Sequence, residues 1–354
     1  MKNKENHTLG KSSNQGTSFL FGHEKQINFL LDRIKTSQIP NAWLFHGPMG
    51  VGKASLALNL GKVLSNINFS KKDCVMGISE ENLRNPKTTI NISNIFYCRR
   101  RWDDKKKLFQ KYISIEDIRE LNRKFFLSSA DNSYKVCIVD TTEDLNIPAS
   151  NSLLKILEEP PQNTLFILVS NNQQSILPTI LSRCQKIGFQ GLSEKDLRHI
   201  CESFGKEPPF DQSRGASAVT ACDGSVRKLL NFLDKDYIKV FKSMEELILD
   251  LPNFNKKKVF TLLADNKDYL SSNDPDKSAF GILLRLLSSL AKKEIVLNID
   301  TNFVDEDVGL IAAHLYSQIS LLRHESLEYN IDQKKAVFLA LNTIEMTFAK
   351  YKKK

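Results

Sequence analysis

Closely spaced cysteines, long apolar runs and an apolar leader are all missing from this sequence of 354 residues. Its six cysteines are isolated and form no CxxC pair, so we expect free thiols rather than a zinc ribbon. No stretch approaches the roughly 18 consecutive apolar residues that a membrane helix needs. Residues 1–18 are polar and lack the apolar segment of a secretory signal. We therefore expect a cytoplasmic chain with a loose tail over residues 1–18, no metal and no membrane association.

The composition is that of a folded, basic protein. Hydrophobic residues make up 41% of the chain, which is enough to bury a core. At roughly 100–200 residues per domain, the length predicts two or three domains. The formal net charge of +9 favours a polyanionic partner such as nucleic acid, although lysines that are merely solvated would give the same balance.

Apolar runs and helical patterns alternate through the first half of the chain. Residues 41–47, 135–140 and 164–172 are short, nearly continuous apolar runs, and residues 113–127 have the periodicity of an amphipathic helix. Buried strands separated by helices are typical of a parallel sheet covered on both faces. Only helical patterns follow after about residue 190.

This pattern predicts how the chain divides. We expect an α/β domain over residues 19–190, a small helical domain over 191–238 and an all-helical domain over 239–354. Within the first of these, the spacing of apolar residues over 19–40 fits one amphipathic helix that ends near Pro40. Residues 66–112 are charged and are expected to be irregular.

A phosphate-binding loop follows the first predicted strand. Residues 47–53, Gly-Pro-Met-Gly-Val-Gly-Lys, fit the pattern G-x-x-x-x-G-K between a strand and a helix. The glycines Gly47, Gly50 and Gly52 allow backbone N–H groups to close around phosphate oxygens, and the helix N-terminus adds positive potential. Lys53 would reach the terminal phosphates. We therefore expect a P-loop that could bind ATP.

Two positions depart from an active ATPase site. Ala54 stands where the hydroxyl ligand of Mg²⁺ is expected, and Ser55 lies one residue later, about 100° further around the helix, from where it would have to swing back to replace that ligand. Asp140, at the end of the strand 135–140, could hold Mg²⁺ through water. The acid that should follow it to activate water is replaced by Thr141. We therefore expect weak Mg²⁺ binding and poor hydrolysis at this degenerate site.

A polar sensor is expected at the end of the next strand. Asn171 follows the apolar run that begins at Thr164, so its side chain could detect a γ-phosphate. Asparagine and serine are also common in strand-end turns, and the sequence leaves both roles open.

Three segments together resemble one family. These are NAWLFHGPMGVGKASLA at 41–57, SLLKILEEPP at 152–161 and LPTILSRCQ at 177–185. They resemble the clamp-loader subunits of bacterial DNA polymerase III, which are members of the AAA+ class. The P-loop, with Ala54 in place of a hydroxyl residue after Lys53, is most similar to that of the delta-prime type. The resemblance covers about residues 20–235. It implies an AAA+ P-loop domain, a small helical lid and a helical collar through which subunits assemble.

The resemblance also assigns roles to two arginines. Arg183, in the Ser-Arg-Cys motif with Ser182 and Cys184 as supporting neighbours, would project into the ATP site of an adjacent subunit. Arg227 would match the second sensor of the lid, which contacts bound nucleotide. Taken alone, Arg183 would be interpreted as a surface charge at a helix end, and Arg227 could equally be a solvated helix charge. Many relatives carry four zinc-binding cysteines after the first helix, but this region offers only Cys74 and Cys98, so no zinc is expected.

The implied partners are the gamma/tau and delta subunits in a hetero-pentamer, and through that complex the sliding clamp and primed DNA. Three other functions compete with this one. A catalytically active gamma/tau-like ATPase is supported by Lys53, Asp140 and Arg227. A P-loop kinase would need a catalytic base in an acceptor lid, for which the sequence has no motif. A direct DNA binder would use residues 99–107, where Trp102 could stack on a base, but two aspartates interrupt the basic run.

Overall fold

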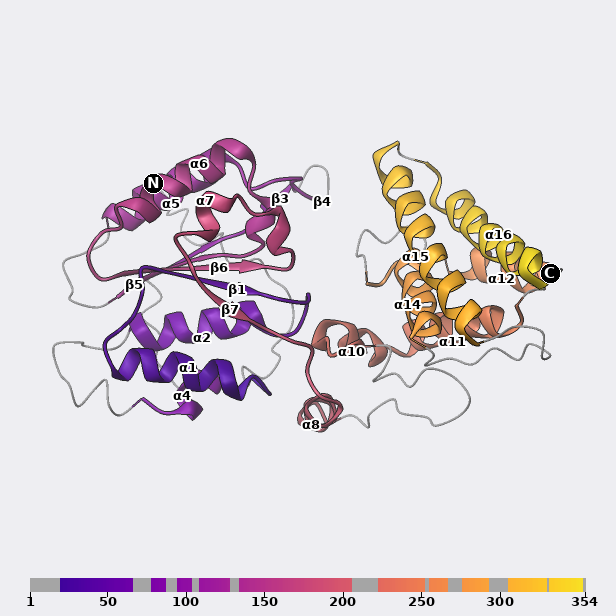
Figure 1. Ribbon diagram of the computed structural model, residues 1–354, viewed down its shortest axis with the longest axis horizontal. Coiled ribbons are helices and arrows are strands. Elements are labelled where there is room, and N and C mark those ends of the chain that lie inside the picture. Colours follow the sequence, from indigo (N-terminus) through magenta and orange to yellow (C-terminus); the bar gives the residue numbers. More distant parts are fainter. Residues whose placement is uncertain are drawn as a thin grey trace, which may run out of the picture. The chain divides into compact units, whose positions relative to one another are not determined.

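The computed structural model divides into two compact units, Met1–Phe204 and Gly205–Lys354, each described here by itself (Figure 1). The structure describes residues 20–65, 78–86, 94–103, 108–127, 134–205, 222–251, 255–266, 276–292, 305–329 and 331–352. The predicted tail at 1–18 and Cys74 lie outside these residues. None of the helices in this part of the chain is long and apolar enough to cross a membrane.

A five-stranded parallel sheet forms the centre of the first unit. Its strand order is β2-β5-β6-β1-β7, and each neighbouring pair is parallel. The strands are β1 (Ala42–His46), β2 (Ile95–Cys98), β5 (Lys135–Val139), β6 (Thr164–Ser170) and β7 (Gln185–Gly188). The predicted parallel sheet is therefore confirmed. Because its carboxyl ends lie at one edge, the residues that follow β1, β5 and β6 come together there.

Helices cover both faces of this sheet (Figure 1). On one face lie α1 (Glu24–Lys35), α2 (Lys53–Ser65) and α4 (Glu80–Arg84), and on the other α5 (Ile115–Leu127), α6 (Ile147–Glu158) and α7 (Pro178–Leu181). The helix α8 (Glu194–Ser203) follows β7.

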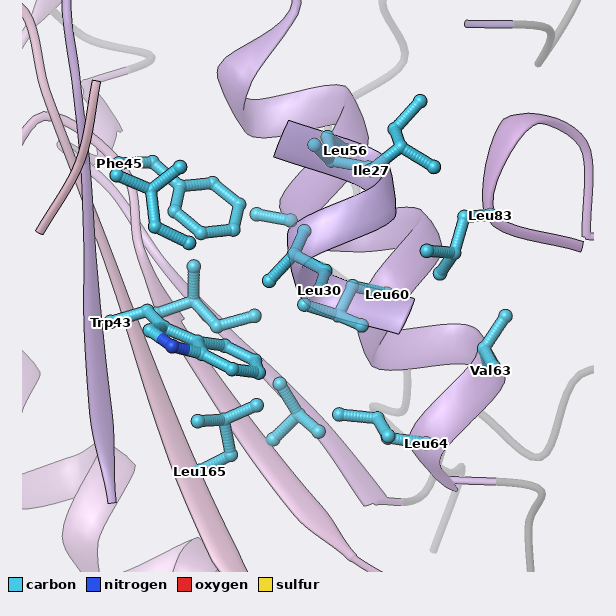
Figure 2. Packing of buried hydrophobic residues seen from close by; sticks show 14 of the residues in the cluster. Ile27, Leu30, Trp43, Phe45, Leu56, Leu60, Val63, Leu64, Leu83 and Leu165 are labelled. Atoms are coloured by element: carbon cyan, nitrogen blue, oxygen red, sulfur yellow. The ribbon is translucent and has the colours of Figure 1, made fainter. Parts of the chain in front are cut away.

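The alternation of side chains along each strand builds two cores. Trp43 and Phe45 of β1 face α1 and α2, whereas Leu44 faces the opposite side with α5 and α6. Figure 2 shows Trp43 and Phe45 packed toward Ile27 of α1 and Leu56 of α2. Since strands buried on both faces need apolar residues at every position, the nearly continuous apolar runs in the sequence are explained.

Two local predictions were wrong in part. The amphipathic helix predicted within 19–40 is present as α1, Glu24–Lys35, but it ends at Lys35 rather than near Pro40, because Ser37 adopts a left-handed backbone conformation that a helix cannot contain. The segment 66–112 is not wholly irregular. It contains α4, β2 and a two-stranded antiparallel hairpin of β3 (Trp102–Asp103) and β4 (Leu108–Phe109). β2 is a short apolar run, Ile-Phe-Tyr-Cys, that lies among polar and charged residues, whereas β3 and β4 have two residues each and are too short to show a period.

The second unit is helical throughout its described residues, as predicted. Its helices are α10 (Val226–Phe232), α11 (Lys235–Leu249), α12 (Lys256–Asp265), α14 (Ala279–Ala291), α15 (Asp305–Glu328) and α16 (Gln333–Lys352). The finer boundaries at residues 190 and 238 remain predictions.

Candidate nucleotide-binding site

The loop between β1 and α2 has the backbone of a phosphate-binding loop. Gly47, Gly50 and Gly52 have φ values of 146°, 80° and 107°, which side chains rarely adopt. At Gly47 a Cβ atom would also lie 2.2 Å from the carbonyl oxygen of Phe189. The loop therefore needs glycine at its first position both for backbone conformation and for space.

Lys53 begins α2 and turns back over the loop. Its side chain is buried, with 3% of the residue exposed, and Nζ donates to the carbonyl oxygens of Gly47 (2.8 Å) and Pro48 (2.5 Å) and to Oδ1 of Asn171 (2.9 Å). Burial lowers the pKa of Lys53 to about 8, although the nearby carboxylates Glu143 and Asp140 act in the opposite direction. All three ammonium hydrogens thus have acceptors, and a phosphate would have to replace them.

Asn171 connects Lys53 to a carboxylate. It follows β6 directly, as predicted, and its backbone N and Nδ2 donate to Oε1 of Glu143 at 2.9 and 3.0 Å. Glu143 lies in the short 3₁₀ helix η2 (Thr142–Asp144). Its other oxygen, Oε2, is buried and has no hydrogen-bond partner among the described residues. A buried carboxylate oxygen without a donor is a place where a water or a cation would be stabilised.

Asp140 follows β5 and accepts a hydrogen bond from Tyr97. The Tyr97 hydroxyl lies 2.6 Å from Oδ2 of Asp140, and burial together with that carboxylate raises the pKa of Tyr97, so the phenol stays protonated. Thr141 has a left-handed backbone (φ 60°), and its hydroxyl donates to the carbonyl oxygen of Asp140 at 2.6 Å. The residue in place of the expected catalytic acid is therefore hydrogen-bonded to its own backbone.

The residues present fit a phosphate better than they fit its metal. Ala54 is half-buried and offers only a methyl group, while Ser55 is exposed on the outer side of α2. The carboxylates of Asp140 and Glu143 could hold a cation, but no group of three or more metal-ligating side chains gathers anywhere in the described parts of the chain. The glycine loop and Lys53 would hold the phosphates of a nucleotide, whose bound Mg²⁺ would lack its usual hydroxyl ligand.

His23 contacts the backbone of the loop and was not predicted from the sequence. Its Nε2 lies 2.7 Å from the carbonyl oxygen of Val51, and its ring packs edge-on against Phe189 at 5.0 Å. Burial lowers the pKa of His23, which keeps the imidazole neutral. No sequence signal marks this residue, because it lies 28 positions from its partner and belongs to no motif.

Arg183 lies on the surface after α7. Nη2 donates to Oε1 of Glu158 at 2.7 Å, and Nη1 donates to the carbonyl oxygen of Thr179 at 2.9 Å. About a third of the arginine side chain is exposed. Cys184 beside it is half-buried, and burial raises the pKa of its thiol to about 12, so the thiol stays protonated. The Ser-Arg-Cys segment thus presents one fixed guanidinium and an inert thiol.

Arg227 belongs to α10 of the second unit. Its Nε lies 3.2 Å from Oδ2 of Asp276, and the same carboxylate lies 3.6 Å from the buried guanidinium of Arg285. Its predicted contact with nucleotide would need the two units to meet, and it stays a prediction.

The comparisons with known proteins agree with one another. A family model described as DNA polymerase III, delta subunit, matches residues 22–193. The DNA polymerase III gamma subunit of Buchnera aphidicola is 30% identical over 261 residues, which are 69% of this chain and 65% of that protein. The DNA polymerase III tau subunit of Escherichia coli is 29% identical over 221 residues, 60% of this chain and 32% of that protein. The chain is similar to clamp-loader subunits of DNA polymerase III over 60–69% of its length.

A solved structure supports the same fold. The crystal structure of a DNA polymerase III gamma subunit-related protein from Thermotoga maritima covers 91% of this chain and 99% of its own, with a TM-score of 0.50 and 16% sequence identity. At that identity the likeness shows the fold alone. The predicted fold, a parallel sheet covered by helices on both faces and followed by a helical part, is confirmed. The chain spans 65% of the Buchnera protein and about a third of the Escherichia coli protein.

Proposed function

We propose that the chain is a delta-prime-type subunit of the clamp loader, which helps to place the sliding clamp on primed DNA. It would assemble with gamma/tau and delta subunits in a hetero-pentamer and act in the cytoplasm. In this proposal the domain over 19–190 is the AAA+ domain of one subunit of the pentamer. The segment 191–238 is its lid, and the segment 239–354 is its part of the collar. The chain would donate Arg183 to a neighbour's ATP site and hydrolyse little ATP itself.

The observation that carries this proposal is the exposed, hydrogen-bonded guanidinium of Arg183. An arginine that acts on the ATP site of a neighbouring subunit must reach out of its own subunit. The side chain of Arg183 is held at the surface by Glu158 and by the carbonyl of Thr179. Arginine stays charged at all relevant pH values, and its planar fork matches phosphate oxygens. A cation placed beside a γ-phosphate stabilises the charge of the transition state and contributes roughly 10³–10⁵ in rate in related enzymes.

The chain's own site supports the non-catalytic half of the proposal. Ala54 has no hydroxyl group to bind the metal. Thr141 stands where a water-activating acid is needed, and its hydroxyl is hydrogen-bonded to the backbone. Lys53 is already bonded to two carbonyls of its own loop and to Asn171. We infer that a nucleotide could bind here through the loop and Lys53, with Asp140, Asn171 and Arg227 as further ligands, but that its hydrolysis would be slow.

One observation favours the second candidate, an active gamma/tau-like ATPase. Glu143 accepts a hydrogen bond from Asn171 through Oε1. Its other oxygen, Oε2, could accept a proton from an attacking water. This role would compensate for Thr141. The two relatives named above are also a gamma and a tau subunit.

Reconstitution tests the function and separates the two candidates. The chain is mixed with gamma/tau and delta subunits of the same source, and loading of a labelled sliding clamp onto primed DNA is measured with the chain present or omitted. We expect an assembled complex whose loading depends on the chain, together with negligible ATP turnover by the chain alone. Turnover by the chain alone that Glu143→Gln abolishes would favour the active ATPase, and failure to assemble would contradict both candidates.

A further inference from the structure

The hairpin of β3 and β4 exposes two large aromatic side chains. Trp102 and Phe109 are directly opposite each other in the antiparallel pair, with 50% and 48% of each residue exposed. Their rings meet edge to face with centroids 5.0 Å apart. Opposite residues in such a pair lie on the same face of the hairpin, so the two rings form one exposed aromatic surface. The proposed clamp-loader chemistry uses neither residue.

The base of the hairpin is fixed to the body of the first unit. Arg101 pairs with Asp117, which is buried, and donates to Glu120 of α5 at 2.6 Å. Arg100 pairs with Asp144 of η2 at 2.9 Å. The carbonyl oxygen of Arg101 also accepts from the backbone N of Gln110 at 2.8 Å, which closes the ladder. The rings are therefore exposed on an anchored support rather than at a frayed end.

The surrounding segment is strongly basic. Residues 99–112 contain seven arginines and lysines and two aspartates, a formal net charge of +5, of which Arg100 and Arg101 are paired with carboxylates outside the segment. Lys111 lies over the ring of Tyr112, with Nζ 5.3 Å from its centroid, and Tyr112 is itself about half exposed. Three of the lysines, at 105–107, belong to the connection between β3 and β4, outside the described residues.

We propose that the exposed aromatic face of this hairpin, formed by Trp102 and Phe109, binds single-stranded nucleic acid. Bases would stack on the two rings, and Lys111 would contact a phosphate. Exposed aromatic rings beside a cationic segment are the combination that holds single strands without sequence preference. A duplex would not suit them, because its bases are already stacked on one another. A protein partner is disfavoured because lysine is depleted in protein interfaces, whereas here it is concentrated.

The proposal goes beyond the role of Arg183 and is independent of it. It would give the subunit a direct hold on the unpaired part of a primed template. Arg100 ties the hairpin to η2, the same short helix that carries Glu143 beside the nucleotide site.

Intrinsic fluorescence of the full-length chain tests the proposal. The chain has two tryptophans, and Trp43 is completely buried. A change in fluorescence emission caused by a ligand at the surface therefore reports on Trp102. Addition of an unlabelled oligodeoxythymidylate should quench the emission at low salt, and the quenching should weaken as salt rises. Trp102→Ala should abolish the response. In the anisotropy of a labelled oligodeoxythymidylate, Phe109→Ala should weaken binding about tenfold, the loss expected for one stacked base.

A matched control is available in the second unit. Phe260 is also an exposed ring in contact with another aromatic, Phe338, with centroids 5.5 Å apart. Phe260→Ala should leave the oligonucleotide affinity unchanged. The proposal is overturned if Trp102→Ala and Phe109→Ala bind the oligonucleotide as tightly as the original chain. It is equally overturned if a blunt duplex binds as tightly as the single strand, or if a purified sliding clamp changes the Trp102 emission while the oligonucleotide does not.

Discussion

Arg183 and Glu158 form an ion pair on the surface of the first unit, with Nη2 2.7 Å from Oε1. The two residues lie 25 positions apart, one at the end of α6 and one after α7. Both belong to segments that were singled out in the sequence, Leu-Glu-Glu-Pro-Pro and Ser-Arg-Cys. Neither segment predicts that the two residues pair.

This pair should contribute little to the stability of the chain. More than a third of each side chain is exposed, and exposed ion pairs are worth about 0–1 kcal/mol. We expect Arg183→Ala and Glu158→Gln each to change the free energy of unfolding by less than about 1 kcal/mol, measured by urea denaturation. A much larger loss would mean that Arg183 is a structural residue, and any effect of its removal on a neighbour's activity would then need another explanation.

Gly47 should tolerate no side chain. Its φ of 146° and the 2.2 Å approach to Phe189 mean that an alanine must distort the loop or move β7 away. We expect Gly47→Ala to destabilise the chain by about 2 kcal/mol or more in urea denaturation, and to weaken nucleotide binding. Gly61 is the matched control, since it lies within α2 and a Cβ there would meet Val136 at an ordinary 3.5 Å. Gly61→Ala should be neutral or stabilising by up to about 1 kcal/mol, and equal losses at the two glycines would contradict this assignment.

Lys53 should titrate far below an ordinary lysine. Burial lowers its pKa to about 8, so the ammonium is charged below that pH and increasingly neutral above it. Lysine-specific carbon NMR should show one side chain with a midpoint near 8, and Lys53→Met should remove that signal. Because a phosphate needs the charged form, nucleotide affinity should fall as the pH rises through 8, by at most about tenfold per pH unit. A midpoint near the ordinary lysine value would contradict the buried contacts.

His23 should make the chain sensitive to acid. Burial lowers its pKa in the folded state, so between that value and the ordinary 6.5 the unfolded chain binds more protons than the folded chain. The free energy of unfolding should therefore fall as the pH drops below about 6.5. His23→Asn keeps a residue that tolerates the left-handed backbone but cannot titrate, so its stability should fall less steeply between about pH 7 and about pH 5. The pKa of His46 is lowered as well, so some slope should remain, but identical slopes would refute this role for His23.

The sequence predicted the parts of the fold that leave a periodic or glycine-rich signal. The buried strands around Leu44 and Phe166 show as apolar runs, because both of their faces are covered. The P-loop shows because its glycines are needed for backbone conformations. The hairpin around Trp102 was missed, since two-residue strands with exposed side chains are too short for any period.

The candidate site could be predicted only where its residues follow strands. Lys53, Asp140 and Asn171 were found because parallel strands end at one edge of the sheet, and the structure places all three there. Glu143 was not among the residues predicted for this site. The turn η2 brings it to Asn171, and a 3₁₀ turn of three residues cannot be oriented from sequence alone. The support of the loop by His23 depends on a contact between distant residues and left no trace in the sequence.

The most direct test of the account compares two single variants in the reconstituted clamp loader. ATP turnover stimulated by DNA and clamp is measured with Arg183→Ala or Lys53→Ala in this chain and all other subunits unchanged, after size-exclusion chromatography shows that each complex assembles. The account predicts a loss of at least about tenfold for Arg183→Ala and little change for Lys53→Ala, because the guanidinium acts on a neighbour while the chain's own site contributes little turnover. The reverse result, with Lys53→Ala inactive and Arg183→Ala unchanged, would contradict it and identify this chain as one of the motor subunits.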